Sequence, residues 1–244
     1  MKRRHQSHRL AAVVSRYLRN RRVTMILTAL ILAMFLRQVQ VAMTCCDYTL
    51  TRVAFAPGDD VLLRCGAAYT GMPLQQDWWR LVASMFIHGG VIHLAANTLA
   101  LLQLGYLLEG LFGSTAVVVS FSLGGSLAGL IAVTFPGSER GMIYVGASGA
   151  IFAIAGTLLV GLRRLRALEH GGWPKRLSSR LVGCLAFNLV LGLAISALAT
   201  WADLGFAIAN SAHVAGLVAG VLIGFTLPLR LRENELSERM TRIV

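Results

Sequence analysis

Charged residues are scarce in this chain, and acidic residues are the scarcest of them. Asp, Glu, Lys and Arg together make up 14% of the 244 residues, and only 11 residues are Asp or Glu. Hydrophobic residues make up 56%, and the mean hydropathy is +0.66. A soluble globular domain carries about 25% charged residues. The composition therefore excludes that class and indicates an integral membrane protein.

Sequence patterns for metal or nucleotide chemistry are missing as well. No His and Cys residues recur at zinc-ligand spacing, and no glycine-rich phosphate loop follows a strand-like segment. Of the four cysteines, Cys45, Cys46 and Cys65 fall at or near the expected outer face, where a disulfide can form in an oxidising compartment, and Cys184 begins a span. We expect no metal, no cofactor and no required disulfide bridge.

Long uncharged runs are abundant. A helix needs about 20 residues to cross a bilayer, and five charge-free runs exceed that length: 81–108, 111–137, 141–162, 181–202 and 204–229. The run at 23–36 is shorter, but a crossing at about 23–45 is reasonable if Arg37 snorkels outward and Arg21 and Arg22 inward. A cleaved signal peptide is the alternative there, although no small-residue cleavage pattern clearly follows. We therefore expect an all-α polytopic membrane protein with six transmembrane helices.

Basic residues gather in three segments. Residues 1–22 hold eight Lys or Arg and no acid, 163–180 hold six, and 229–244 hold four. The positive-inside rule assigns these segments to the cytoplasm, and an even number of spans must join the first to the last. We expect both termini in the cytoplasm, a basic N-terminal segment at 1–22, a six-helix membrane domain at 23–228 and a short tail at 229–244. A bacterial plasma membrane is the expected location, with an organellar targeting sequence as the alternative role for 1–22.

The net charge of +12 would suggest nucleic acid in a soluble protein. In a membrane protein, this charge is explained by the basic segments on the cytoplasmic side and by their attraction to a lipid bilayer with anionic headgroups. We expect no nucleic-acid partner. The sequence does not indicate an oligomeric state.

A serine and a histidine stand at membrane depth, where polar side chains are costly and usually functional. Ser148 opens the fourth span within Gly146-Ala147-Ser148-Gly149, close to the free amides of a helix N-terminus. His213 lies one to two turns into the sixth span. Gly220 and Gly224 fall within about 20° of His213 on a helix, and Gly216 within about 60°. Close packing of small residues is the structural alternative for both segments.

The fourth span carries its own small residues, Gly149, Ala153 and Gly156. If the two small-residue faces pack together, Ser148 and His213 reach hydrogen-bond distance. No carboxylate lies at that depth, because Asp203 is ten residues from His213 and Glu109 lies at the opposite end of the second span. The expected chemistry is therefore a Ser-His dyad without a third member.

Further polar residues occupy the outer half of the second span. His93 and Asn97 are four residues apart and so share one helical face, whereas His88 should point elsewhere or lie in the loop. Interhelical hydrogen bonding is the structural alternative for this pair. The preceding outer loop of about 35 residues, 46–80, is long for a structureless connection, and it ends with Trp79 and Arg80. Tryptophans there are also typical membrane-interface anchors.

Together these residues resemble the rhomboid family of intramembrane serine proteases. The similarity covers roughly residues 60–228 and rests on motifs that are specific only in combination. They are Trp79-Arg80, His88 with His93 and Asn97, Gly146-Ala147-Ser148-Gly149, and Ala212-His213-Val214-Ala215-Gly216. The resemblance implies that the fold is a rhomboid-like bundle.

The resemblance also implies the roles of individual residues. Ser148 is the expected nucleophile and His213 the general base and acid. His93, Asn97 and the amides of Ser148 and Ala147 are the expected oxyanion donors, and the Trp-Arg loop has an expected structural role at the membrane surface. One departure is Phe152, where many relatives carry tyrosine; the ring can still stack on His213, but a hydroxyl contact is lost.

The expected activity is hydrolysis of single-pass membrane proteins inside a membrane-embedded cavity that water reaches from the outer side. Substrate helices would have to unwind, since a helical backbone is already hydrogen-bonded. Two alternatives remain. A catalytically inactive rhomboid-like binder of membrane proteins usually lacks the serine or the histidine, and a small transporter more typically shows paired charges or repeated halves.

Overall fold

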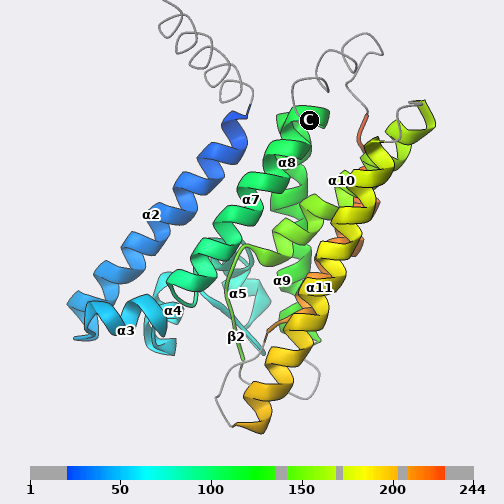
Figure 1. Cartoon of the computed structure of the whole chain (residues 1–244). Coiled ribbons are helices and arrows are strands. Elements are labelled where there is room, and N and C mark those ends of the chain that lie inside the picture. Colours follow the sequence, from blue (N-terminus) through cyan, green and yellow to red (C-terminus); the bar gives the residue numbers. More distant parts are fainter. Residues whose placement is uncertain (1–20, 136–141, 169–172, 203–207, 229–244) are drawn as a thin grey trace, which may run out of the picture.

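A computed structural model describes residues 21–135, 142–168, 173–202 and 208–228 of the chain as a bundle of long helices (Figure 1). Nearly all of the basic segment 1–22, the tail 229–244 and Asp203 lie outside the described residues. The long helical segments are α2 (Arg22–Cys45), α7 (Val91–Phe112), α8 (Ser114–Val119) with the π-helical turn η2 (Ser120–Gly124) and α9 (Gly125–Thr134), α10 (Ser148–Leu168), α11 (Trp173–Trp201) and α12 (Asn210–Thr226).

Five of these segments are long and apolar enough to cross a membrane, because α8, η2 and α9 form one continuous segment, Ser114–Thr134. The sixth, α12, has 17 residues, which is the lower end of the range for a crossing helix. The predicted all-α polytopic membrane protein is thus confirmed. The count of six crossings and the cytoplasmic location of both termini stay predictions.

The observed helix boundaries differ most from the charge-free runs in three spans. The second helix begins at Val91, since residues before it form the short helices α6 (Arg80–Ala83) and η1 (Ser84–Phe86). Gly90 has a φ of +125°, and a Cβ there would lie 2.9 Å from the carbonyl oxygens of Ala54 and Phe55, so glycine is needed where the chain turns into α7. Helices α10 and α11 extend into the basic residues between them.

The helix α10 is the centre of the bundle, as Figure 1 also shows. In its membrane window 78% of the residues are buried, against 17% in α11 at the periphery. The buried core around it contains residues of α7, α8, η2 and α10, including Leu101, Phe121 and Leu158. A helix enclosed by other helices can present polar side chains away from lipid.

The contact between α10 and α12 is made by backbone against backbone. Gly216 lies against the carbonyl of Gly149, and Gly220 lies against the carbonyl of Ala153, with no space for a Cβ at either position. The Thr157 hydroxyl donates to the carbonyl oxygen of Gly220 at 2.9 Å and accepts from Ser120 at 2.8 Å. The predicted pairing of the two small-residue faces is therefore confirmed.

The start of α2 is capped by a residue of α7. Both carboxylate oxygens of buried Glu109 accept hydrogen bonds from α2: the Val23 amide at 3.0 Å, the Thr24 amide at 2.9 Å and the Thr24 hydroxyl at 2.7 Å. The Ser114 hydroxyl donates to the same carboxylate at 2.8 Å. Free amides at a helix start need such acceptors, so Glu109 joins α2 to the bundle.

The outer loop between α2 and α7 is folded, as its length predicted. It contains α3 (Leu50–Phe55), α4 (Asp59–Cys65), α5 (Leu74–Asp77) and strand β1 (Ala68–Tyr69). Strand β1 pairs antiparallel with β2 (Ile143–Tyr144), in the register Ala68 to Tyr144. The pair connects the loop to the chain just before Ser148.

Candidate active site

Ser148 and His213 lie in direct hydrogen-bond contact. The distance between Ser148 Oγ and His213 Nε2 is 2.8 Å. Ser148 is the first residue of α10, and His213 lies in the first turn of α12, slightly earlier in its helix than the sequence predicted. The close approach of Gly216 to Gly149, one turn along, brings the two helix starts together. A hydroxyl beside an unprotonated imidazole nitrogen is the arrangement that activates a serine nucleophile.

The backbone before Ser148 takes a conformation that favours glycine. Gly146 has a φ of +112°, which L-residues with side chains rarely adopt. Its amide donates to the carbonyl oxygen of Ser84 at 2.9 Å, which fixes the loop to η1. Ala147 is fully buried behind this turn. This turn directly precedes Ser148, the first residue of α10.

The ring of Phe152 packs flat on the imidazole of His213. Their planes differ by 1° and the ring centroids lie 4.5 Å apart. Phe152 is one turn after Ser148 on α10, so a single helix supplies both the hydroxyl and the surface that orients the histidine. The expected stacking contact is therefore present without the tyrosine hydroxyl.

His93 and Asn97 face the turn at Gly146. A Cβ on Gly146 would lie 2.7 Å from His93 Nε2 and 3.6 Å from Asn97 Nδ2, so both nitrogens border the space in front of this residue. The Gly89 amide donates to His93 Nδ1 at 3.3 Å. A neutral imidazole that accepts at Nδ1 carries its proton on Nε2. Asn97 Nδ2 donates to the His93 carbonyl at 3.1 Å with one of its two hydrogens.

His88 is fully buried in the segment before α7, as one of the two sequence expectations had it. Its ring lies edge-on to that of His93, with centroids 5.2 Å apart. The side chain of Gln38 in α2 bonds both backbone groups of His88: it accepts from the amide at 3.0 Å and donates to the carbonyl at 2.9 Å. His88, held by Gln38, thus packs against the ring of His93.

Gln38 itself was missed by the sequence reasoning. It is fully buried in a mainly apolar helix. An amide side chain inside such a span was the available signal, although the sequence alone does not distinguish Gln38 from the exposed Gln40 two residues later.

No carboxylate supports His213 among the described residues, where its Nδ1 is buried and has no hydrogen-bond partner. Within the same part of the chain, no three His, Cys, Asp or Glu side chains lie close enough together to hold a metal ion. The site residues that the structure describes supply a serine hydroxyl, an imidazole and several N–H donors.

Trp79 and Arg80 belong to the outer loop, and Arg80 makes its hydrogen bonds within that loop. The Arg80 guanidinium donates to the carbonyl oxygens of Leu63 and Ala67 at 3.0 and 3.1 Å and pairs with Asp77 at 3.2 Å. It also lies over the ring of Trp79, 4.6 Å from the centroid. These bonds hold the end of α4 and the approach to β1.

The comparison with known protein families gives one match, to the model of the rhomboid domain, over residues 75–230. This range includes α7 to α12 and every site residue that the sequence predicted, but not Gln38. It leaves α2 and most of the outer loop outside the matched segment.

Curated relatives cover a similar part of the chain. The chain is 30% identical over 173 residues to the rhomboid protease GluP of Bacillus subtilis, which is 70% of this chain and 30% of that protein. It is 34% identical over 162 residues to the rhomboid protease GlpG of Klebsiella pneumoniae, covering 66% of this chain and 52% of the relative.

A plant relative is similar to the same extent. RHOMBOID-like protein 5 of Arabidopsis thaliana is 32% identical over 177 residues, or 71% of this chain and 52% of the plant protein. The chain thus spans between about a third and about half the length of these relatives.

Proposed function

Because the chain belongs to the rhomboid family, we propose that it is an intramembrane serine endopeptidase that cleaves single-pass membrane proteins within or near their transmembrane helix. The observation that carries the proposal is the 2.8 Å contact between Ser148 Oγ and His213 Nε2 at the start of two packed helices. Two of the relatives are named rhomboid proteases.

In the proposed reaction Ser148 is the nucleophile and His213 the general base. His213 Nε2 takes the hydroxyl proton while Oγ attacks the scissile carbonyl carbon. The imidazolium then gives this proton to the leaving amine, and an acyl-enzyme remains. A water molecule attacks the ester with His213 again as base, and the acid product leaves. Phe152 keeps the imidazole plane fixed through both proton transfers.

The oxyanion of each tetrahedral intermediate needs preorganised donors. The proposed donors are the Nε2–H of His93, the free hydrogen of Asn97 Nδ2 and the backbone amides at Ser148 and Ala147. The first two border the turn at Gly146. The amides at the start of α10 add the positive end of the helix dipole.

The proposed substrates have small or helix-destabilising residues near the outer face of the membrane. An intact substrate helix hides its carbonyl groups in internal hydrogen bonds, so a segment that unwinds cheaply is preferred. The proposed location is a bacterial plasma membrane, with both termini in the cytoplasm and six crossings. The basic residues at the ends of α2, α10 and α11 support that orientation.

The test is cleavage of a model single-pass substrate by the full chain in lipid vesicles. Wild type should release two fragments, and Ser148→Ala and His213→Ala should both release none while keeping the thermal unfolding midpoint of wild type. A fluorophosphonate probe should label wild type at Ser148 and leave Ser148→Ala unlabelled. Cleavage by Ser148→Ala would contradict the proposal.

The inactive binder is the other outcome of the same experiment. A folded wild-type protein that cleaves none of several substrates and takes no fluorophosphonate label would be assigned to that class. Substrate capture without cleavage would then be measured by co-purification from the vesicles.

A further inference from the structure

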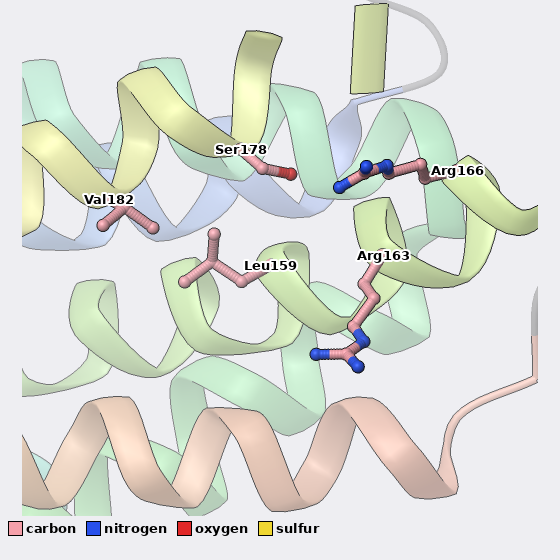
Figure 2. Close-up of a pocket in the computed structure, with 5 residues that line it drawn as sticks. All are labelled: Leu159, Arg163, Arg166, Ser178 and Val182. Carbon is pink, nitrogen blue, oxygen red and sulfur yellow. The ribbon is translucent and has the colours of Figure 1, made fainter. Parts of the chain in front are cut away.

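A cavity lies far along α10 from Ser148, between the C-terminal part of α10 and the N-terminal part of α11 (Figure 2). Its volume is about 660 Å³, which falls in the range of small-molecule sites. The lining residues come from both helices: Leu159, Arg163, Arg166, Ser178 and Val182. We call it the basic pocket.

The lining follows from helical periodicity. Leu159, Arg163 and Arg166 occur at positions i, i+4 and i+7 of α10 and so share one face. Ser178 and Val182 are four apart on α11 and share the facing side. In Figure 2 the Arg166 guanidinium and the Ser178 hydroxyl point toward each other, Leu159 and Val182 face each other farther into the bundle, and the Arg163 side chain points away from Ser178, toward α12. The pocket is therefore polar at one end and apolar at the other.

Both arginines of the pocket lack a partner in the described part of the chain, where neither makes a hydrogen bond or an ion pair. No acidic side chain is among the described residues that line the pocket. Arg164, which lies between them on the helix, behaves differently: it donates to the carbonyl oxygens of Gly224 and Leu227. Arg164 thus joins α10 to α12, whereas Arg163 and Arg166 line the pocket without such bonds.

We propose that the basic pocket binds the phosphate headgroup of an anionic phospholipid. Arg166 and the Ser178 hydroxyl, which point toward each other, would bind the phosphate oxygens, and Arg163 would add a second positive charge at the pocket. Two apolar side chains, Leu159 and half-exposed Val182, would lie along the first methylenes of the acyl chains. Basic pockets between transmembrane helices are known to hold such headgroups.

The phosphate chemistry alone fits a lipid or a free phosphate ester. The lipid is favoured because Val182 both lines the pocket and is exposed, and further apolar side chains, Phe187 and Val190, are exposed along α11. A ligand with an apolar tail gains from that surface, and a soluble phosphate does not. The site would join α10 to α11, the helix that is least buried in the bundle.

The experiment measures lipid retention by the full chain in detergent with native mass spectrometry. Phosphatidylglycerol and phosphatidylcholine would be added at equal concentration, and glycerol 3-phosphate in a separate arm. Wild type should retain phosphatidylglycerol, and the Arg163→Gln/Arg166→Gln variant should retain on the order of tenfold less. Phosphatidylcholine, whose headgroup has no net charge, should bind both proteins weakly.

A matched control is Arg176→Gln/Arg180→Gln, which removes the same charge from exposed positions of α11 outside the pocket. This control should keep the wild-type affinity for phosphatidylglycerol. An equal loss in both double variants would overturn the proposal in favour of general attraction to basic residues. Equal binding of glycerol 3-phosphate would overturn the assignment to a lipid. The unfolding midpoints of both variants, measured without added lipid, separate lost binding from lost folding.

Discussion

The α-carbon of Gly220 in α12 lies directly against the backbone carbonyl of Ala153 in α10, without room for a methyl group. Because the obstacle is backbone in a buried helix, a Gly220→Ala variant can relieve the clash only by separating the two helices. We expect a loss of about 1–3 kcal/mol in unfolding free energy, together with a large loss of cleavage as Ser148 and His213 move apart. Thermal unfolding and substrate cleavage would be measured in parallel.

The control for this variant is Gly183→Ala in α11, where an added Cβ meets nothing within 4 Å. Alanine is the better helix former by about 1 kcal/mol, so this change should leave the unfolding midpoint unchanged or raise it. Equal midpoints for the two alanine variants would contradict the tight packing of α10 on α12.

The flat contact between Phe152 and His213 predicts a kinetic effect. Aromatic stacking contributes about 0.5–1.5 kcal/mol beyond burial, so Phe152→Leu should lower kcat/KM by about 2- to 10-fold. Phe121→Leu serves as control, since Phe121 pairs with Phe86 at 5.7 Å and makes no ring contact with the imidazole. That control should lower stability with little change in the rate per folded molecule. An unchanged rate in Phe152→Leu would show that the stack does not orient His213.

The reciprocal bonds between Gln38 and His88 predict a stability effect that reaches the active site. Gln38→Leu fits the apolar helix but leaves the amide and carbonyl of His88 buried without partners, at about 1–3 kcal/mol each. Both the unfolding free energy and the cleavage rate should fall, because His88 packs against His93. Gln40→Leu, an exposed change two residues later, should leave both quantities near wild type. If the unfolding free energies and cleavage rates of Gln38→Leu and Gln40→Leu were similar, the bonds between Gln38 and His88 would not stabilise the active site.

The guanidinium of Arg80 should stabilise the outer loop through its hydrogen bonds to backbone carbonyls. Arg80→Lys keeps the charge but cannot bind the carbonyls of Leu63 and Ala67 with the same geometry. Charged hydrogen bonds contribute about 1.5–3 kcal/mol, and a loss of that order is expected in denaturant unfolding. Arg64→Lys, an exposed change in the same loop, is the control. If Arg80→Lys unfolds at the wild-type denaturant concentration, the outer loop does not depend on these bonds.

The sequence predicted a helix well where a charged residue lies at the end of that helix. The first span, expected at 23–45, is α2 (Arg22–Cys45). Hydropathy failed where a helix runs past a charged residue, as α10 does through Arg163 and Arg166, or where apolar residues pack in a folded loop before Val91. The π-helical turn η2 has no hydropathy signal at all, since its residues are as apolar as their neighbours.

The meeting of Ser148 with His213 could be predicted because it depends on local periodicity, which small residues every four positions reveal. The contribution of Gln38 could not, because its bonds to His88 join residues 50 apart and depend on the tertiary packing of α2. The basic pocket was hidden for the same reason. Arginines 163, 164 and 166 are alike in sequence, and only the packed helices separate the one that bonds α12 from the two that do not.

The bonds from the start of α2 to Glu109 have a consequence for synthesis. Val23 leaves the ribosome 86 residues before Glu109, or roughly 4–17 s earlier at 5–20 residues per second. During that interval the first amides of α2 have only water or lipid headgroups as acceptors. The helix that enters the membrane first therefore gains these bonds only once α7 has been synthesised. Nascent chains that stop before residue 109 should hold α2 loosely enough for a translocon or chaperone to retain it.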